Sequence, residues 1–254
     1  GVDVGTSRWD CSLETVDGGE PALRLGLRQI KGLGRGTADR ILAARDRAGF
    51  TDIADLVRRA NLDRRDRRAL TRAGALAGLA EHRHAAYWAA QGVAPLPGLF
   101  ADHPASDDTP ELPAPAEGED IVADYASLGL TLGRHPLALI RDRLARLQAG
   151  TAADFAGLDH DQPARVAGIV TMRQRPGTAK GVMFLTLEDE TGQVNVIVWP
   201  QLVTRFRRQA LAARLLLVSG VMQRSGEVRH LRADRLEDHS PLLGRLTTRS
   251  RDFH

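Results

Sequence analysis

The chain has 254 residues, and at about 100–200 residues per domain this length fits one large or two modest domains. Hydrophobic residues make up 43% and charged residues 26%, so the chain can bury an ordinary core and does not belong to the disordered class. No segment has the roughly 18 uncharged apolar residues of a membrane span, and none resembles a secretion signal. We therefore expect a cytoplasmic protein without a membrane partner.

No set of residues with the pattern of a catalytic site stands out in the sequence. The single cysteine, Cys11, excludes an internal disulfide, and no Cys/His cluster has zinc-ligand spacing. The tightest acidic run, residues 188–190, is interpreted as a solvated strand end, because alternation along a strand separates its carboxylates. No glycine-rich nucleotide loop precedes Lys-Ser/Thr. We predict no catalytic residue, metal site or cofactor in this chain. Because the chain starts at Gly1 without methionine, we expect it to be part of a longer polypeptide.

Basic residues are unevenly distributed, and all but two of the 35 are arginine. Residues 24–100 carry a local charge of +8, residues 101–126 carry −8, and residues 163–239 carry +5. Two basic blocks around an acidic spacer are typical of a chain with two surfaces for a polyanion. GC-rich codon usage and solvated helix faces would give a similar composition, so charge alone favours nucleic acid only slightly.

The first third of the chain shows helical periodicity. We interpret residues 1–20 as the tail of an upstream element and residues 21–91 as an all-helical block. Its first helix is predicted to bury Leu23, Leu27 and Ile30. The five helices are expected to begin near Pro21, Thr37, Thr51, Asp63 and Glu81, with Thr51 and Asp63 as capping residues.

The remainder divides by composition. Residues 92–120 are rich in proline and acidic residues and are predicted to be a linker. Residues 121–162 are expected to be a helical connector, with a helix from Pro136. Residues 163–239 alternate with period two, and residues 240–254 are expected to be a C-terminal tail. The five candidate strands are 165–173, 182–188, 193–199, 215–222 and 227–236, with a helical segment after the third. This order is typical of the five-stranded OB barrel.

The strongest local signal is the segment IKGLGRGTADRI, residues 30–41. It resembles the hairpin of a helix-hairpin-helix motif. Gly32 and Gly34 permit a tight turn, so that backbone N–H groups at the start of the second helix face outward toward a phosphate oxygen. Leu33 would pack between the helices, with Gly36 and Thr37 opening the second one. An αα-hairpin in which the glycines only end a helix is the alternative.

Basic side chains would add charge beside this phosphate site. Such a module binds the duplex backbone without reading bases, because phosphate contacts position but do not specify. A solvated helix face is the alternative for the arginines on the later helices. The candidate contacts are Lys31, Arg35, Arg40, Arg64, Arg65 and Arg68.

The barrel is a candidate for binding single strands, which requires a basic groove and flat side chains on which bases stack. Phe184 and Trp199 are the flat candidates, although such residues more often fill a barrel core. The basic candidates near strand ends and turns are Arg173, Arg175, Lys180, Arg224, Arg229 and Arg232. The predicted fold class is α+β: a helix-hairpin-helix block, a linker and a five-stranded OB-fold β-barrel.

Four segments occur in an order that points to a family: residues 25–34 (LGLRQIKGLG), 61–76, 128–137 and 184–192 (FLTLEDETG). Together they resemble the C-terminal region of the C-family, DnaE-type bacterial DNA polymerases. The ending shortly after the barrel is most like the error-prone branch, called ImuC. The resemblance covers nearly the whole chain in the family's order.

This resemblance implies a parent DNA polymerase that performs damage-induced translesion synthesis with accessory mutagenesis proteins. The catalytic palm with its magnesium-binding aspartates would lie upstream of Gly1, so this part would not polymerise alone. Replicative members carry a sliding-clamp peptide after the helical block. Leu99 and Phe100 resemble a remnant of it, but Gln91 is too distant for a standard clamp peptide, so the clamp is the less favoured partner.

We therefore expect a DNA-binding region whose helical block holds duplex and whose barrel holds single-stranded template. Two alternatives remain open. One is a protein-interaction module that docks accessory subunits with little DNA contact, and the other is an RNA-binding barrel.

Overall fold

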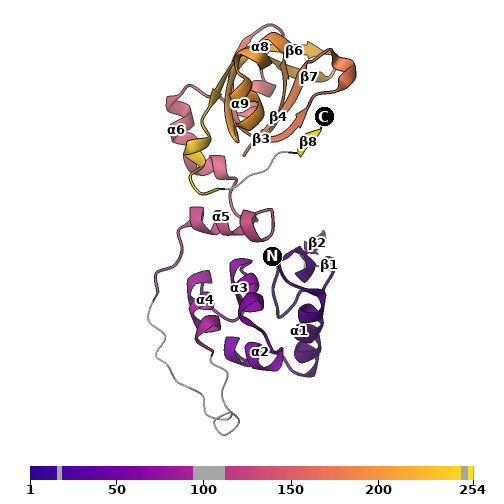
Figure 1. Ribbon diagram of the computed structural model, residues 1–254, viewed down its shortest axis with the longest axis vertical. Helices are drawn as coiled ribbons and strands as arrows, with labels where there is room; N and C mark the ends of the chain where they lie inside the picture. Colours follow the sequence, from indigo (N-terminus) through magenta and orange to yellow (C-terminus); the bar gives the residue numbers. More distant parts are fainter. Residues whose placement is uncertain (16–18, 94–111, 247–250, 254) are drawn as a thin grey trace. The chain divides into compact units, whose positions relative to one another are not determined.

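The computed structural model describes residues 1–15, 19–93, 112–246 and 251–253. The chain folds as two compact units, Gly1–Leu132 and Gly133–His254 (Figure 1). The first unit is mainly helical and the second contains a closed β-barrel, so the α+β prediction is confirmed. Within the described ranges, no helix is long and apolar enough to cross a membrane.

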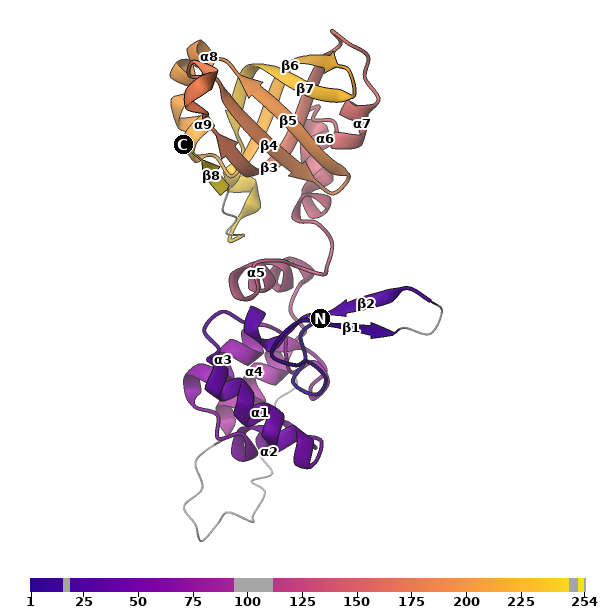
Figure 2. The same cartoon turned by 90° about the vertical axis from the view of Figure 1, so that its right-hand side faces the viewer.

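The first unit consists of a two-stranded ribbon and a group of helices. Its core is built from fully buried aliphatic residues such as Leu27, Ile41, Leu56 and Leu70. Its elements are β1 (Ser12–Thr15), β2 (Pro21–Arg24), the 3₁₀ helix η1 (Leu27–Gln29), α1 (Arg35–Arg47), α2 (Ile53–Arg59), α3 (Arg64–Arg72), α4 (Arg83–Gly92) and α5 (Glu117–Ser127). Figure 2 shows the β1–β2 ribbon extending away from α1 to α4.

The helix predicted from Pro21 is wrong. Pro21–Arg24 form β2, which pairs with β1 in an antiparallel ribbon. The N–H of Leu27 donates to the carbonyl of Arg8 (2.8 Å), so this segment hydrogen-bonds to a distant segment rather than within a helix. Gly26 permits that approach, because a Cβ there would lie 2.3 Å from the carbonyl oxygen of Trp9. Leu23, expected in the core, is 61% exposed.

The first residues of the chain contact the core of the helical unit. Val2 and Val4 are buried in the same core as the helices. The N–H of Val4 also donates to the carbonyl of Ala75 at 2.9 Å. The first residues of the chain therefore belong to the helical unit.

Aspartates cap α2 and α3. Asp52, rather than the predicted Thr51, accepts the N–H of Asp55 at 2.7 Å. Asp63 caps α3 as predicted and accepts the N–H of Asp66 at 2.7 Å. Such caps are typically worth about 1 kcal/mol, because they satisfy an amide that has no partner within the helix.

The predicted linker, residues 92–120, is helical at its end. α5 begins at Glu117, and residues 94–111 lie outside the described ranges. Arg83 of α4 binds Asp120 (2.8 Å) and Asp124 (2.6 Å), and these ion pairs attach α5 to the helical unit.

The second unit is an OB barrel preceded by short helices. The predicted five strands and the helical segment after the third are confirmed. Its elements are η3 (Pro136–Ile140), α6 (Arg141–Arg146), α7 (Ala152–Ala156), β3 (Pro163–Gln174), η4 (Gly177–Ala179), β4 (Met183–Asp189), β5 (Gly192–Val198), α8 (Pro200–Arg205), α9 (Arg207–Ala212), β6 (Leu215–Ser225), β7 (Val228–Asp238), η5 (Ser240–Leu243) and β8 (Arg251–Phe253).

The barrel closes through the order β3–β4–β5–β7–β6 and back to β3. β5 and β7 are parallel, and the other four pairings of this ring are antiparallel. β8 pairs in parallel with β3, so part of the predicted C-terminal tail extends the sheet. The helix predicted from Pro136 is instead a 3₁₀ turn followed by α6.

The acidic run 188–190, at the end of β4, makes contacts within the unit and is not a solvated strand end. Asp189 is 5% exposed and accepts the N–H groups of Ala152 (2.8 Å) and Thr191 (2.7 Å). Arg141 binds Asp189 (3.3 Å) and Glu190 (2.7 Å). These contacts attach α6 and α7 to the barrel.

His135 is half-buried at the start of η3 in a position where its protonation should affect the stability of the barrel unit. Its Nδ1 accepts the N–H of Leu137 (3.2 Å), which requires that nitrogen to be unprotonated. Burial lowers the pKa of His135 below its ordinary value, although Glu188 opposes this shift. Because the folded-state pKa is the lower one, the stabilisation is complete above about pH 6.5 and is lost as the pH falls.

We predict that the urea midpoint of the barrel unit falls between pH 7.5 and 5.5 more in the unchanged chain than in His135→Asn. Asparagine keeps a capping oxygen but does not titrate in this range. The measurement is urea denaturation followed by circular dichroism at several pH values. Identical pH dependence in both proteins would contradict the prediction.

Candidate nucleic-acid interface

The hairpin between η1 and α1 is shaped by its two glycines. Gly32 has a φ of +89°, in the region that favours glycine. Leu33 is buried beneath the turn. Gly34 is extended and stands at the N-cap of α1. The turn therefore directs the start of α1 outward while its apolar residue packs inward.

The N-terminus of α1 has no cap of its own. Gly34 has no side chain to accept the first-turn amides, and no acidic residue lies in that turn. The N–H groups of Arg35, Gly36 and Thr37 have no acceptor among the described residues. A Cβ at Gly34 or Gly36 would meet nothing within 4 Å, so the surface above these amides is open. Open amides at the positive end of a helix dipole form a site for an anion.

A pocket of ≈ 440 Å³ adjoins this helix start. Arg40 and Arg65 bring positive charge to it, whereas the carboxylates of Asp63 and Asp66 are already engaged within the unit. Its lining residues are Gly32, Leu33, Gly34, Thr37, Arg40, Asp63, Arg65 and Asp66. The structure thus brings together six of the predicted duplex contacts.

Asp66 organises the floor of this pocket. It is 6% exposed, and it accepts hydrogen bonds from the Thr37 hydroxyl (3.0 Å) and from Arg40 (3.3 Å). Arg40 also donates to the carbonyl of Ala60 at 2.9 Å. These contacts tie α1 to α3 and fix the guanidinium of Arg40 beside the hairpin.

The arginines of α3 divide into two groups. Arg64, Arg65 and Arg68 are exposed, and none of their side chains has a hydrogen bond or ion pair with another described residue. Arg67 is half-buried and donates to the carbonyls of Leu62, Ala90 and Val93, and burial lowers its pKa. The first group is free to bind phosphate, whereas Arg67 holds the helices together.

Two predicted DNA contacts, Lys31 and Arg35, interact with other residues of the helical unit. The ammonium group of Lys31 donates to the carbonyls of Tyr125 (3.0 Å) and Ala126 (3.2 Å), at the end of α5. Arg35 pairs with Asp39 (2.9 Å) and stacks over the ring of Trp9. Lys31 therefore stabilises the end of a helix, where its charge complements the dipole.

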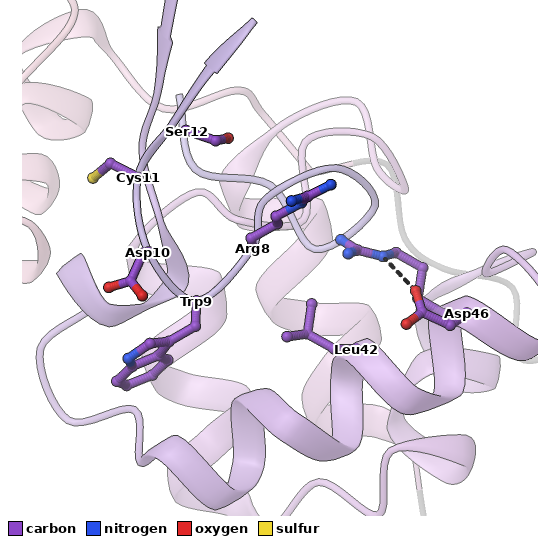
Figure 3. A pocket seen from close by; sticks show the side chains of 8 residues that line it. Arg8, Trp9, Asp10, Cys11, Ser12, Leu42 and Asp46 are labelled. Carbon is purple, nitrogen blue, oxygen red and sulfur yellow. Dashed lines mark ion pairs between the residues drawn. The ribbon is translucent and has the colours of Figure 1, made fainter.

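A second pocket, of ≈ 570 Å³, lies beside a different part of α1. Leu42 projects from α1 toward the loop that carries Arg8 and Trp9 (Figure 3). Its lining has two arginines and two aspartates, the same charge balance as the hairpin pocket, but it does not include the open N-terminus of α1. This pocket is less suited to phosphate than the one at the hairpin.

The outer face of the barrel carries two rows of side chains across β4, β5 and β7. The inward positions are filled by apolar residues such as Leu185, Val196 and Leu231, so the alternate positions point outward. Register places Phe184, Ile197 and Arg232 in one row. Thr186, Asn195 and His230 form the next, which we call the polar row. Of these six, only Phe184 and Arg232 are predicted from the sequence.

Trp199 lies at the end of β5 and is 53% exposed, so the interpretation as barrel core is wrong for this residue. Phe184 is half-buried on the outer face. The guanidinium of Arg175 and the ring of Pro200, which follows Trp199, both lie beside Gly181, since a Cβ at Gly181 would be 3.6 Å from each. Lys180 is exposed in the same loop.

Arg173 is not available to a ligand, which corrects its prediction as a single-strand contact. It is 8% exposed, and its guanidinium donates to the carbonyls of Ala210 (2.9 Å) and Ala213, at the end of α9. It also pairs with Asp252 at 3.7 Å. Burial lowers the pKa of Arg173.

Arg224 and Arg229 are cross-strand neighbours at the hairpin between β6 and β7. Arg224 is exposed and donates to the carbonyl of Gly226 at 3.1 Å. Their position at a turn agrees with the prediction. Leu99 and Phe100, the predicted clamp remnant, lie outside the described residues.

Comparison with known proteins agrees with both units. Residues 1–86 match the family model described as helix-hairpin-helix motif, and residues 164–238 match the one described as OB-fold nucleic acid binding domain. Proteins named error-prone DNA polymerase match the whole chain: that of Alkalilimnicola ehrlichii at 58% identity and that of Pseudomonas aeruginosa at 51%. The chain is homologous to their C-terminal region.

The expected resemblance to error-prone DNA polymerases is therefore confirmed. The chain spans 25% of the length of each of these two relatives. Among solved structures, asparaginyl-tRNA synthetase from Pyrococcus horikoshii is similar at 24% identity and a TM-score of 0.27, over 31% of this chain and 20% of that one. That likeness is too low to add to the argument.

We predict that Asp66→Ala destabilises the helical unit by about 1–3 kcal/mol, because the Thr37 hydroxyl and Arg40 lose a buried acceptor. Asp39→Ala serves as the matched control, since Asp39 only pairs with Arg35 on the surface and such pairs are worth about 0–1 kcal/mol. Urea denaturation of both variants measures the difference. Equal effects would show that Asp66 does not organise the pocket.

Proposed function

We propose that this chain is the DNA-binding C-terminal region of an error-prone DNA polymerase. The helical unit binds the backbone of duplex DNA at the open N-terminus of α1, and the barrel binds single-stranded template on its outer face. The observation that carries the proposal is the contrast within the first unit: aspartates cap α2 and α3, whereas α1 begins at Gly34 with its amides unpaired.

Each part of the duplex site has a physical role. The amides of α1 would donate to one phosphate, while Arg40 and Arg65 supply charge beside the same pocket. Arg64 and Arg68, one helical turn apart on α3, would bind neighbouring phosphates. Contacts of this kind do not read bases, which suits a polymerase that must bind any sequence.

The barrel site combines stacking and charge. Trp199 and Phe184 offer faces for bases, and Arg175, Lys180 and Arg232 offer cations for the backbone. Arg224 and Arg229 extend the basic surface along the hairpin between β6 and β7.

We propose that the parent protein is a DNA-directed DNA polymerase acting in translesion synthesis in the cytoplasm. When two DNA-binding units are joined to a catalytic part, they raise the effective concentration of that catalytic part on DNA. Polymerisation and magnesium binding are assigned to the part of the relatives that this chain does not span. Accessory mutagenesis proteins would be its partners, and clamp binding through Leu99 and Phe100 is the less favoured partnership.

The duplex site is tested by Gly34→Asp. An aspartate at this N-cap can accept the α1 amides itself and repels phosphate, so the helix remains capped while the anion site is blocked. Hydrogen bonds to a charged group are worth about 1.5–3 kcal/mol, so we expect about tenfold or greater weakening of duplex binding. The log–log salt slope should become shallower by about 0.9 for one lost phosphate contact.

Gly49→Asp provides the matched control, because it adds the same charge at an exposed glycine beyond the other end of α1. Fluorescence anisotropy at several salt concentrations measures both variants. The proposal predicts a small change in this control. Equal weakening by the two substitutions would indicate general charge repulsion rather than a phosphate site at Gly34.

The single-strand site is tested by Trp199→Ala. Stacking of a base on an aromatic side chain is worth about 1–3 kcal/mol, so single-strand affinity should fall about fivefold to a hundredfold. Leu211→Ala is the control, because Leu211 is also a large exposed apolar residue, at 42% exposure. Unchanged binding after loss of Trp199, in a variant with normal thermal stability, would contradict stacking at this position.

A further inference from the structure

In the polar row of the barrel's outer face, one hydrogen bond determines which group of Asn195 is available to a ligand. The Thr186 hydroxyl donates to Oδ1 of Asn195 at 3.3 Å, which leaves the amide NH₂ of Asn195 directed to other acceptors. Asn195 is exposed, so this group is accessible to a ligand.

The neighbouring positions on β7 add to this donor character. The guanidinium of Arg232 can only donate, and it has no hydrogen bond or ion pair with another described residue. Nδ1 of His230 is buried and likewise has no partner within the described part of the chain. The fold therefore leaves the guanidinium of Arg232, on the strand next to Asn195, without an acceptor among the described residues.

The next row toward the turn between β4 and β5 has the opposite character. Glu188 presents a carboxylate, which accepts a hydrogen bond from Gln193 at 2.9 Å. A carboxylate repels phosphate, so a bound strand is confined to the half of the face between the polar row and Trp199. A base stacked near Phe184 would then present its edge to Asn195, since residues 184 and 195 lie on adjacent strands one row apart.

We propose that Asn195 makes the single-strand site prefer pyrimidines with a carbonyl group at position 4, as in thymine, over pyrimidines with an amino group at that position, as in cytosine. This inference rests on the proposed binding of single strands by the barrel. Thymine carries the acceptor O4 where cytosine carries the donor N4–H₂. The amide NH₂ of Asn195 satisfies the first and opposes the second.

The test compares two homopolymers that differ only at this edge: oligothymidine and oligo-5-methyldeoxycytidine of equal length. Both bases have the same ring size and the same methyl group, so differences in bulk and methyl contact are removed. Fluorescence anisotropy with the whole chain at one salt concentration should give about fivefold tighter binding of oligothymidine, which corresponds to about 1 kcal/mol. Equal affinities would overturn the inference and leave the proposed single-strand function intact.

Asn195→Asp replaces the donor by an acceptor and should abolish or reverse the ratio of the two affinities. Gln193→Asp is the matched control: it makes the same amide-to-acid change one row away and should weaken both oligonucleotides without changing their ratio. A thymidine preference that survives Asn195→Asp arises from strand flexibility, as single-strand preferences often do, and overturns the inference. Failure to bind either oligonucleotide overturns the proposed single-strand function and this inference with it.

Discussion

Hydrogen-bond satisfaction at the start of a helix is the constraint on which the helical unit depends. Every α-helix begins with amides that its own backbone cannot pair. In α2 and α3 an aspartate accepts one of them, at 2.7 Å in each case. In α1 the N-cap is Gly34, and the tight turn at Gly32 keeps the surface above the first turn clear of side chains. We attribute the proposed DNA contact to that difference, because an anion would supply the hydrogen-bond acceptor that Gly34 lacks.

The surroundings of this helix start limit what can bind there. Asp66 holds Thr37 and Arg40 in place, and the free arginines of α3 lie along the adjoining helix. Basic side chains that bond within the unit therefore stabilise the fold, whereas basic side chains without such bonds are available to phosphate. Arg67 and Lys31 donate hydrogen bonds to carbonyl groups of the same unit. The side chains of Arg64 and Arg68 have no partner among the described residues. The barrel divides its arginines in the same way, with Arg173 inside and Arg175 outside.

The sequence predicts what is repeated locally and misses what depends on distant contacts. Alternation identifies the five barrel strands, because a closed core buries every second residue of each strand. The spacing of Leu23, Leu27 and Ile30 suggests a helix, yet pairing with residues 8–15 makes the segment a strand and a 3₁₀ turn. Arg173 and Arg175 look alike in sequence, and only the carbonyls at the end of α9 distinguish them. Predicting the polar row requires strand register as well as alternation. The sequence supplies alternation but not register.

The most direct test of the central claim follows the backbone amides themselves. Two-dimensional NMR of the isotopically labelled chain, titrated with a short duplex at moderate salt, would report each amide separately. The account predicts the largest shifts at the N–H groups of Arg35, Gly36 and Thr37, with a small change at Asp55, whose amide is already bonded to Asp52. Saturable duplex binding that leaves the first turn of α1 unshifted would contradict it.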